Sequence, residues 1–254
     1  MMRILLVDDE PLAAARLRVA LDKMDDVEVV GSASDGEEAG RQIAQLDPDM
    51  VLLDIQMPEV SGMELAHRLA DAPRRPELVF VTAFNDFAME AFNVDAVDYL
   101  LKPVSFDRLR MAIDRVRRRR ALPDPDAFVR ADFAGTDRGD GGQAGYDDGI
   151  WVPGRGGAVR VPIEAIDRIE AARDYVLLNT ATKCYILRAR MTEIEQRIDP
   201  KIMIRIHRSH MVRIDSVVGI ERPGKGVLRL LLNDGAALQV GSNFQSNVVR
   251  ALRL

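Results

Sequence analysis

The chain has 254 residues, of which 47% are apolar and 30% are charged, and its formal net charge is −5 at pH 7. This balance excludes a disordered chain, and no span approaches the roughly 20 apolar residues of a transmembrane helix. The single cysteine, Cys184, excludes an internal disulfide and a multi-cysteine zinc site, and the N-terminus has no recognisable leader, so we expect a cytoplasmic protein.

The first 121 residues alternate short apolar runs with helical stretches. We expect strands at 4–7, 27–33, 50–53, 78–81 and 97–101, and helices at 11–24, 37–46, 61–70, 86–93 and 105–120. Such a βα repeat predicts an α/β fold, with a doubly wound five-stranded parallel sheet covered on both faces. Ligands of this fold bind at the carboxyl ends of the strands.

Charged and polar side chains follow the predicted strands at that edge of the sheet. Asp8, Asp9 and Glu10 come after the first strand and Asp54 after the third. Carboxylates brought together in this way repel one another unless a hard cation is present, and their oxygens suit Mg²⁺, which we expect as the cofactor.

The fourth and fifth predicted strands end at the same edge with Thr82 and Lys102. An acid, a hydroxyl and an ammonium around one metal ion equip a site for phosphoryl transfer. The alternative for each residue alone is a solvated loop charge, but their placement at successive strand ends favours one common pocket.

Four motifs carry a family resemblance over residues 1–120: LLVDDEP at 5–11, LLDIQMPEVSGMEL at 52–65, VTAF at 81–84 and DYLLKP at 98–103. This half resembles the receiver domain of two-component response regulators, which has the flavodoxin-like fold. The resemblance implies that Asp54 is the phosphoacceptor. It further implies that Asp9, Asp54 and the Gln56 carbonyl hold Mg²⁺, while Asp8 acts through metal-bound water.

By the same resemblance, Thr82 and Lys102 bind the incoming phosphoryl group, and Tyr99 is a switch residue that turns inward. The alternative for Tyr99 is a half-buried tyrosine packed on the last helix. The implied partner is a sensor histidine kinase or a phosphotransfer protein. Since the receiver takes part only in its own phosphotransfer and dephosphorylation, we do not expect an enzyme.

The resemblance also implies a homodimer on phosphorylation, through the face made by the fourth helix, the fifth strand and the fifth helix. Here that face includes Phe87, Met89, Phe92 and the run 115–120. The five arginines of this run are typical of a solvated helix end, which is favoured near the C-terminal end of the helix dipole.

The charge is unevenly distributed along the chain. Residues 1–122 have a net charge of −7, residues 123–150 of −5 and residues 151–254 of +7. Unless this is only uneven surface charge, it indicates separate partners for the two ends, with a polyanion at the basic end. The Gly- and Asp-rich residues 122–149 predict a flexible linker between a receiver at 1–121 and a second domain at 150–254.

The C-terminal part reads as mostly antiparallel β structure. We predict strands at 158–161, 165–171, 175–179, 184–187, 217–220, 227–232 and 237–240, and a helix at 192–198 that begins with a capping box at Thr192. Basic residues fall at predicted strand ends and loops, where they could contact phosphates: Arg173, Lys183, Arg205, Arg208, Arg213, Arg222 and Lys225. Cys184 is expected to be a small buried hydrophobe. His207 is expected to help pack a turn, the alternative being a contact with DNA or a metal ion.

Three motifs carry a second resemblance over roughly 150–254: IDRIEAARDYVLL at 166–178, ILRARMTEIEQRI at 186–198 and RIHRSHMVRIDSVVGIE at 205–221. They are similar to the LytTR DNA-binding domain, a β fold whose loops enter major grooves of double-stranded promoter DNA. The resemblance implies DNA contacts from the following residues in three loops: Arg173, Asp174, Tyr175, Arg208, Ser242 and Asn243.

The last of these loops departs from the family pattern, which often has an arginine where this chain reads Val240-Gly241-Ser242-Asn243. Serine and asparagine can hydrogen-bond bases, but a bidentate contact to guanine is lost. The favoured hypothesis is a phosphorylation-dependent, DNA-binding transcriptional regulator. The alternative is a receiver linked to a degenerate LytTR domain that binds another protein, and no second catalytic constellation favours an enzyme.

Overall fold

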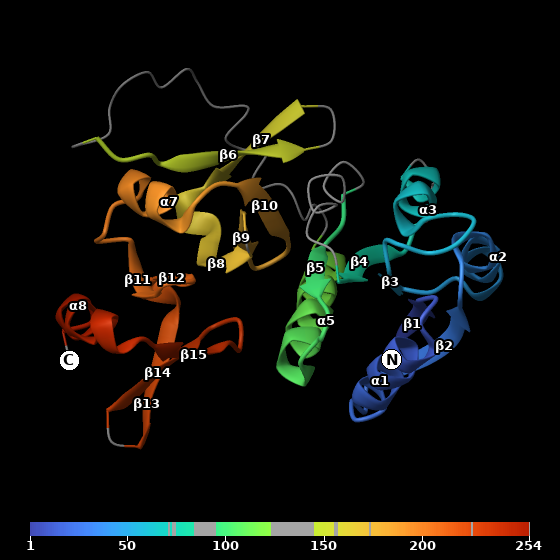
Figure 1. The fold of residues 1–254 in the computed structure, drawn as a ribbon, viewed down its shortest axis with the longest axis horizontal. Helices are drawn as coiled ribbons and strands as arrows, with labels where there is room; N and C mark the ends of the chain where they lie inside the picture. The colour runs from blue at the N-terminus through green and yellow to red at the C-terminus, as the bar shows by residue number, and fades with distance from the viewer. Residues whose placement is uncertain are drawn as a thin grey trace. The chain divides into compact units, whose positions relative to one another are not determined.

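A computed structural model of the chain describes residues 1–70, 72, 75–83, 95–122, 145–154, 157–172, 174–224 and 226–253. The chain divides into two compact units, 1–117 and 118–254, whose elements are labelled in Figure 1. Among the described residues, no helix combines the length and the apolar character needed to cross a bilayer.

The N-terminal unit is built on one parallel sheet with the order β2-β1-β3-β4-β5. Its strands are β1 (Met2–Val7), β2 (Val27–Ala33), β3 (Met50–Leu53), β4 (Glu77–Thr82) and β5 (Asp98–Leu101). The helices are α1 (Pro11–Leu21), α2 (Gly36–Leu46), α3 (Gly62–Leu69) and α5 (Phe106–Ala121). The predicted α/β fold is confirmed, and the helix predicted at 86–93 lies outside the described residues.

The strand order explains where the polar residues gather. β2 lies on one side of β1 and β3 on the other, so the order of the strands reverses between β1 and β3. Asp8 directly follows β1, and Asp54 directly follows its neighbour β3. Below this edge the sheet is covered by a core that includes Ile4, Leu6, Met50, Leu52, Val79, Val81, Leu109, Ile113 and Val116. This packing of the strands against the helices holds in place the strand ends that carry the polar residues.

The C-terminal unit is mostly antiparallel β structure, as predicted. A five-stranded sheet has the order β10-β9-β8-β12-β11, a second sheet the order β13-β14-β15, and β6 pairs with β7. Their bounds are β6 Gly149–Gly154, β7 Gly157–Pro162, β8 Ile166–Ala172, β9 Tyr175–Thr180, β10 Cys184–Arg188, β11 Met203–His207, β12 His210–Arg213, β13 Val217–Gly224, β14 Val227–Leu232 and β15 Ala237–Val240. Two short helices, α7 (Met191–Arg197) and α8 (Gln245–Ala251), complete the unit.

Several boundaries differ from the sequence prediction. The strands β6, β11 and β12 and the helix α8 were not predicted as elements. Helix α7 begins one residue early because the Arg190 N–H donates to the Glu193 carboxylate at 3.1 Å, so Arg190 and not Thr192 stands at the cap. Cys184 is fully buried, as expected.

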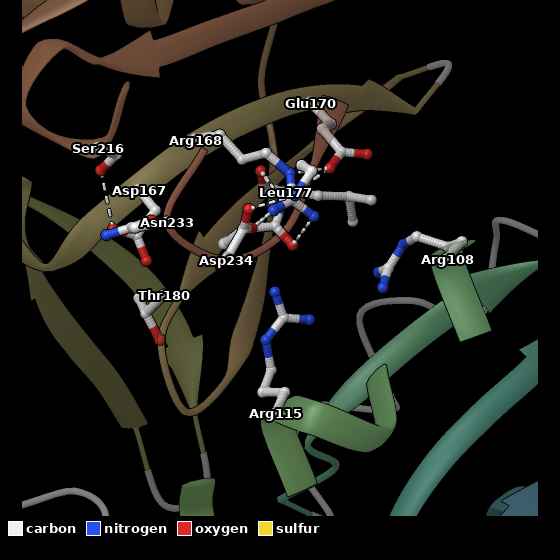
Figure 2. A network of polar contacts seen from close by, with 12 residues as sticks. Arg108, Arg115, Asp167, Arg168, Glu170, Leu177, Thr180, Ser216, Asn233 and Asp234 are labelled. Carbon is white, nitrogen blue, oxygen red and sulfur yellow. Dashed lines mark hydrogen bonds and ion pairs between the residues drawn. The ribbon is translucent and has the colours of Figure 1, made fainter. Parts of the chain in front are cut away.

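A buried polar network joins the sheets of this unit (Figure 2). Arg168 of β8 pairs with Glu170 at 2.6 Å and with Asp234, which lies in the turn between β14 and β15. The neighbouring Asp167 accepts hydrogen bonds from Arg213 and Ser216 at 2.8 and 2.9 Å. Because buried charges are stable only when paired, this network fixes the β14–β15 hairpin against β8.

Candidate functional site

The acidic pocket of the N-terminal unit brings three predicted residues together. Carboxylate oxygens of Asp8, Asp9 and Asp54 lie within 4.8 Å of one another. Asp8 and Asp54 are buried and Asp9 is exposed. The Asp54 N–H donates to the Val7 carbonyl at 2.8 Å, which ties the end of β3 to that of β1. Burial raises the pKa of Asp8, although the Lys102 ammonium opposes this shift.

The Lys102 ammonium pairs with two carboxylates of this cluster. Its Nζ lies 2.6 Å from Asp54 Oδ2 and 2.8 Å from Asp8 Oδ2, and its N–H donates to the Thr82 carbonyl at 2.9 Å. Burial alone would lower the pKa of Lys102, but the bonds to Asp54 and Asp8 outweigh burial and raise it. One ammonium therefore neutralises part of a cluster of three carboxylates.

The donor set fits a magnesium ion. All three candidate ligand side chains offer hard carboxylate oxygens, and one ammonium leaves net negative charge among them. The Gln56 N–H donates to Asp54 Oδ1 at 3.3 Å, so the residue predicted to ligate through its carbonyl lies beside Asp54. Asp9, Asp54 and Gln56 line an open pocket of about 650 Å³ that leaves room for an ion and a small ligand.

Thr82 and Tyr99 lie on the strands next to the pocket. Thr82 ends β4 and is fully buried. Tyr99 of β5 pairs with Phe80 of β4, and only 3% of its surface is exposed, so it is not the half-buried tyrosine of the alternative reading. Its role as a switch stays a prediction.

Gly62 is a residue of this site that the sequence analysis did not single out. A Cβ at this position would lie 1.9 Å from the Asp54 carbonyl oxygen, which no side chain allows. The Gly62 N–H donates to the Ile55 carbonyl at 2.9 Å, and Ser61 caps α3 by accepting from the Glu64 N–H at 3.2 Å. The start of α3 can therefore press against the backbone of Asp54 only because residue 62 is a glycine; the motif around it was the available signal.

The arginine run at the end of α5 is not simply a solvated helix end, which corrects the prediction. Asp98 of β5 is buried and accepts from Arg108 at 2.6 and 2.9 Å and from Arg115. Burial opposes ionisation, but the two guanidinium groups outweigh it and lower the pKa of Asp98 to about 2. Arg117 pairs with Asp26 at 2.6 Å. Phe87, Met89 and Phe92 lie outside the described residues.

In the C-terminal unit, the three loops predicted to face DNA are joined by backbone bonds around the turn between β11 and β12. The Ala171 N–H, at the end of β8, donates to the Ser209 carbonyl at 2.8 Å. The Gly241 N–H, at the end of β15, donates to the Ile206 carbonyl at 2.9 Å. The predicted DNA contacts Asp174, Arg208, Ser242 and Asn243 are exposed and Tyr175 is half-buried, whereas Arg173 lies outside the described residues.

Three of the basic residues predicted to contact phosphates are buried or paired with a carboxylate of the protein. Lys183 is buried, Arg213 pairs with Asp167 at 2.8 Å and Arg205 pairs with Glu195 at 2.6 Å. The position of a cation near a strand end does not reveal such a partner, because the partner comes from another element. Arg208 and Arg222 are exposed, and Lys225 lies outside the described residues.

The histidines of the β11–β12 turn support its conformation. His207 Nδ1 accepts from the Ser209 N–H at 3.3 Å and lies 2.7 Å from Ser209 Oγ, which confirms that His207 helps to pack the turn. Ser209 Oγ also lies 2.9 Å from His210 Nδ1. Burial lowers the pKa of His210 below its ordinary value.

Comparisons with known proteins identify a known family domain in each of the two units. The response regulator receiver domain matches residues 4–114, and the LytTr DNA-binding domain matches residues 156–253. The chain is 34% identical to the positive alginate biosynthesis regulatory protein of Pseudomonas aeruginosa over 259 residues, which cover 99% of each chain.

Two further relatives are similar to all or part of the chain. The sensory transduction protein LytT of Bacillus cereus is 27% identical over 254 residues and the full length of both chains. The transcriptional regulatory protein BtsR of Escherichia coli strain K12 is 45% identical over 124 residues, which are 49% of this chain and 52% of that one.

Proposed function

This chain belongs to the LytTR family of response regulators, and on that premise we propose that it accepts a phosphoryl group on Asp54 from a sensor histidine kinase and then regulates transcription by binding promoter DNA. One observation carries the proposal. Asp54 lies in a carboxylate cluster at a strand-end pocket, with the Lys102 ammonium 2.6 Å away, in the same chain as a DNA-binding domain. A small, doubly charged group fits that pocket.

We assign separate tasks to the residues of the pocket. Asp9, Asp54 and the Gln56 carbonyl, with Asp8 beside them, would hold Mg²⁺, which supplies positive charge for the carboxylates and the phosphoryl oxygens. The Asp54 carboxylate is the nucleophile. Lys102, now shared by Asp54 and Asp8, would turn toward a phosphoryl oxygen, and the Thr82 hydroxyl would donate to another.

We further propose that the phosphorylated receiver signals through β5. Phosphorylation adds charge and strong acceptors at Asp54, so the phosphoryl oxygens offer new acceptors to the Thr82 hydroxyl and to the Lys102 ammonium. The neighbouring Tyr99 would follow Thr82, and the face of the fourth helix, β5 and α5 would then pair two copies into a homodimer. Sedimentation of the full chain with and without a small-molecule phosphodonor tests this step.

The proposed domain limits are a receiver at 1–121, a linker at 122–149 and a DNA-binding domain at 150–254. The family matches, which end at 114 and begin at 156, support a division in this interval. Near the end of the proposed linker, the Asp147 carboxylate pairs with Arg197 of α7 at 2.7 Å. A regulator that binds DNA and takes its phosphoryl group from a kinase would work in the cytoplasm.

Selection of bound sequences from a random DNA pool, by the full chain with and without phosphorylation, tests the function directly. We expect the phosphorylated protein to enrich a repeated motif. Enrichment of no sequence in either state would contradict DNA-based regulation. That outcome would favour the protein-binding alternative, which the Gly241-Ser242-Asn243 loop motivates.

A further inference from the structure

Arg205 of β11 makes contacts with three separate parts of the C-terminal unit. Its Nε donates to the His207 carbonyl at 3.3 Å and its Nη2 to the Arg208 carbonyl at 2.8 Å. Its Nη1 pairs with Glu195 of α7 at 2.6 Å. The guanidinium carbon lies 5.8 Å from the centre of the Phe244 ring, within the range of a cation–π contact. Only 15% of the Arg205 side chain is exposed.

The turn that Arg205 contacts needs such support. β11 and β12 are joined by the two residues Arg208 and Ser209, and the preferred two-residue hairpin turn has a positive φ at both central positions. Neither residue has a positive φ. A turn without that geometry splays its strands, and the register of this hairpin shifts between Arg205 and His207. The two carbonyls that Arg205 binds are those at the start of this turn.

The backbone of Arg208 is consequently held from both sides. Arg205 binds the carbonyls of His207 and Arg208, while the following Ser209 N–H donates to His207 Nδ1 and the Ser209 carbonyl accepts from Ala171. The Arg208 side chain itself is exposed. The β11–β12 turn thus exposes the Arg208 guanidinium from a backbone that the protein holds in place.

Phe244 connects the same guanidinium to the last loop. It ends the short helical turn Ser242–Phe244 and follows directly on the two exposed polar residues of that loop. The Phe244 N–H donates to the Gly241 carbonyl at 2.9 Å, and Gly241 is itself bonded to Ile206 of β11. Arg205 therefore lies between the Arg208 turn and the Ser242–Asn243 loop and touches both.

We propose that Arg205 is a positioning residue for DNA recognition, which orients Arg208 and the Ser242–Asn243 loop together without contacting DNA itself. This inference rests on the proposed function. The planar guanidinium uses one edge for the two carbonyls, another for Glu195 and a face for Phe244, which a lysine ammonium cannot reproduce. A side chain that reads a base binds best when the backbone that carries it is already ordered. If DNA binding must order that backbone, the entropic cost reduces affinity for the specific site.

The test uses the full-length variant Arg205→Lys, which keeps the positive charge but removes the planar guanidinium group. Dissociation constants are measured over a range of salt concentrations on two duplexes, one with the motif that the wild type selects and one of random sequence. We expect affinity for the selected duplex to fall about 10-fold or more, and affinity for the random duplex to stay within about 2-fold with an unchanged salt dependence. Arg229→Lys is the matched control, because Arg229 of β14 also pairs with a glutamate, Glu221 of β13, at 3.4 Å. This variant should change neither affinity.

A double-mutant cycle separates positioning from a general loss of structure. If Arg205 acts through Arg208, adding Arg205→Lys to Arg208→Ala costs clearly less than it costs in the wild type. Fully additive losses would overturn the proposal. So would equal losses on both duplexes with a weaker salt dependence, which would make Arg205 a phosphate contact.

A second variant guards against a folding defect in Arg205→Lys. Glu195→Gln keeps Arg205 but weakens its anchor on α7, and it should reduce affinity for the selected duplex in the same direction by a smaller factor. An unchanged ratio between selected and random duplexes in both variants would contradict the inference while leaving the proposed function intact. Failure of the wild type to select any motif would instead contradict the proposed function.

Discussion

The acidic pocket and the loops predicted to face DNA hold their charges in opposite ways. In the pocket, Asp8 and Asp54 are buried and already paired with Lys102 at 2.6 to 2.8 Å. At the β11–β12 turn, the Arg208 side chain is exposed, and the protein holds its backbone instead. On the proposed function, the ion pairs of the first region exchange partners when a phosphoryl group arrives, whereas the second region presents an exposed cation to DNA.

This difference fits the sizes of the two proposed ligands. A phosphoryl group is small enough to enter a pocket, so its partners can wait in pairs and switch when the group arrives. DNA is a polyanion that meets a surface, where each exposed cation adds a graded amount of affinity. Substitutions should therefore abolish function in the pocket and weaken it by steps on the surface.

The largest expected effect is in the pocket. Asp54→Asn should abolish phosphoryl uptake from a small-molecule donor in the presence of Mg²⁺, because an amide is not a nucleophile for this reaction. Labelling of the full chain with a radioactive phosphodonor measures the uptake. Asp25→Asn, which removes an exposed carboxylate from the loop after α1, should label like the wild type. Undiminished labelling of Asp54→Asn would show that Asp54 is not the phosphoacceptor.

A second prediction concerns the ion pairs behind the pocket. Asp98→Asn should lower the free energy of unfolding of the receiver by about 3 kcal/mol at pH 7, since Arg108 and Arg115 lose their shared carboxylate. The pKa of Asp98 is about 2, below the ordinary value of about 3.9. Its stabilisation is therefore complete above that ordinary value and is lost as the pH falls toward 2.

Urea unfolding of both proteins across this pH range measures the effect, and the difference between wild type and variant should shrink at low pH. Asp114→Asn provides the control, because it removes a half-exposed carboxylate that pairs with Arg117 at 2.7 Å on the same helix. Such a surface pair contributes less than about 1 kcal/mol. Equal losses for the two variants would show that Asp98 is no more important than a surface charge.

The sequence could locate the pocket because the topology of a parallel sheet places the residues that follow its strands at one edge. Asp8, Asp54 and Lys102 follow three different strands, and any doubly wound sheet brings such residues to one edge. The role of Gly62 could not be derived in this way, since it depends on a close approach to the Asp54 carbonyl. The partner of Arg115 was also missed, because a run of arginines does not reveal which one faces β5.

The loops of the C-terminal unit were less accessible to sequence reasoning. Family resemblance predicts which loops face DNA, but it gives no sign that Arg205 has partners within the protein. Its partners are two backbone carbonyls, a glutamate on α7 and the face of Phe244. Carbonyl oxygens occur in every residue, so no pattern of side chains marks them as the target of a particular arginine.

A graded effect is expected at the surface. Arg208→Ala should weaken binding to the selected duplex by about 1 to 3 kcal/mol if Arg208 reads a base, and by much less on random DNA. Arg222→Ala, which removes an exposed arginine of β13, should cost little and equally on both duplexes. Equal losses from Arg208→Ala on both duplexes would make Arg208 a phosphate contact, and complete loss of binding would contradict the graded behaviour expected of a surface.

The smallest effect is expected from His210, which titrates beside the DNA-facing turn among Glu170, Arg168 and His207. Burial lowers the pKa of His210 in the folded protein below its ordinary value of 6.5. The unfolded chain therefore binds a proton first, and stability that is complete above pH 6.5 falls as the pH drops below it, with a slope of less than about 1.4 kcal/mol per pH unit. His210→Gln should flatten this slope in urea unfolding, whereas His67→Gln, on the exposed face of α3, should not. If the unfolding free energy of His210→Gln depends on pH as steeply as that of the wild type, another group is responsible for the pH dependence.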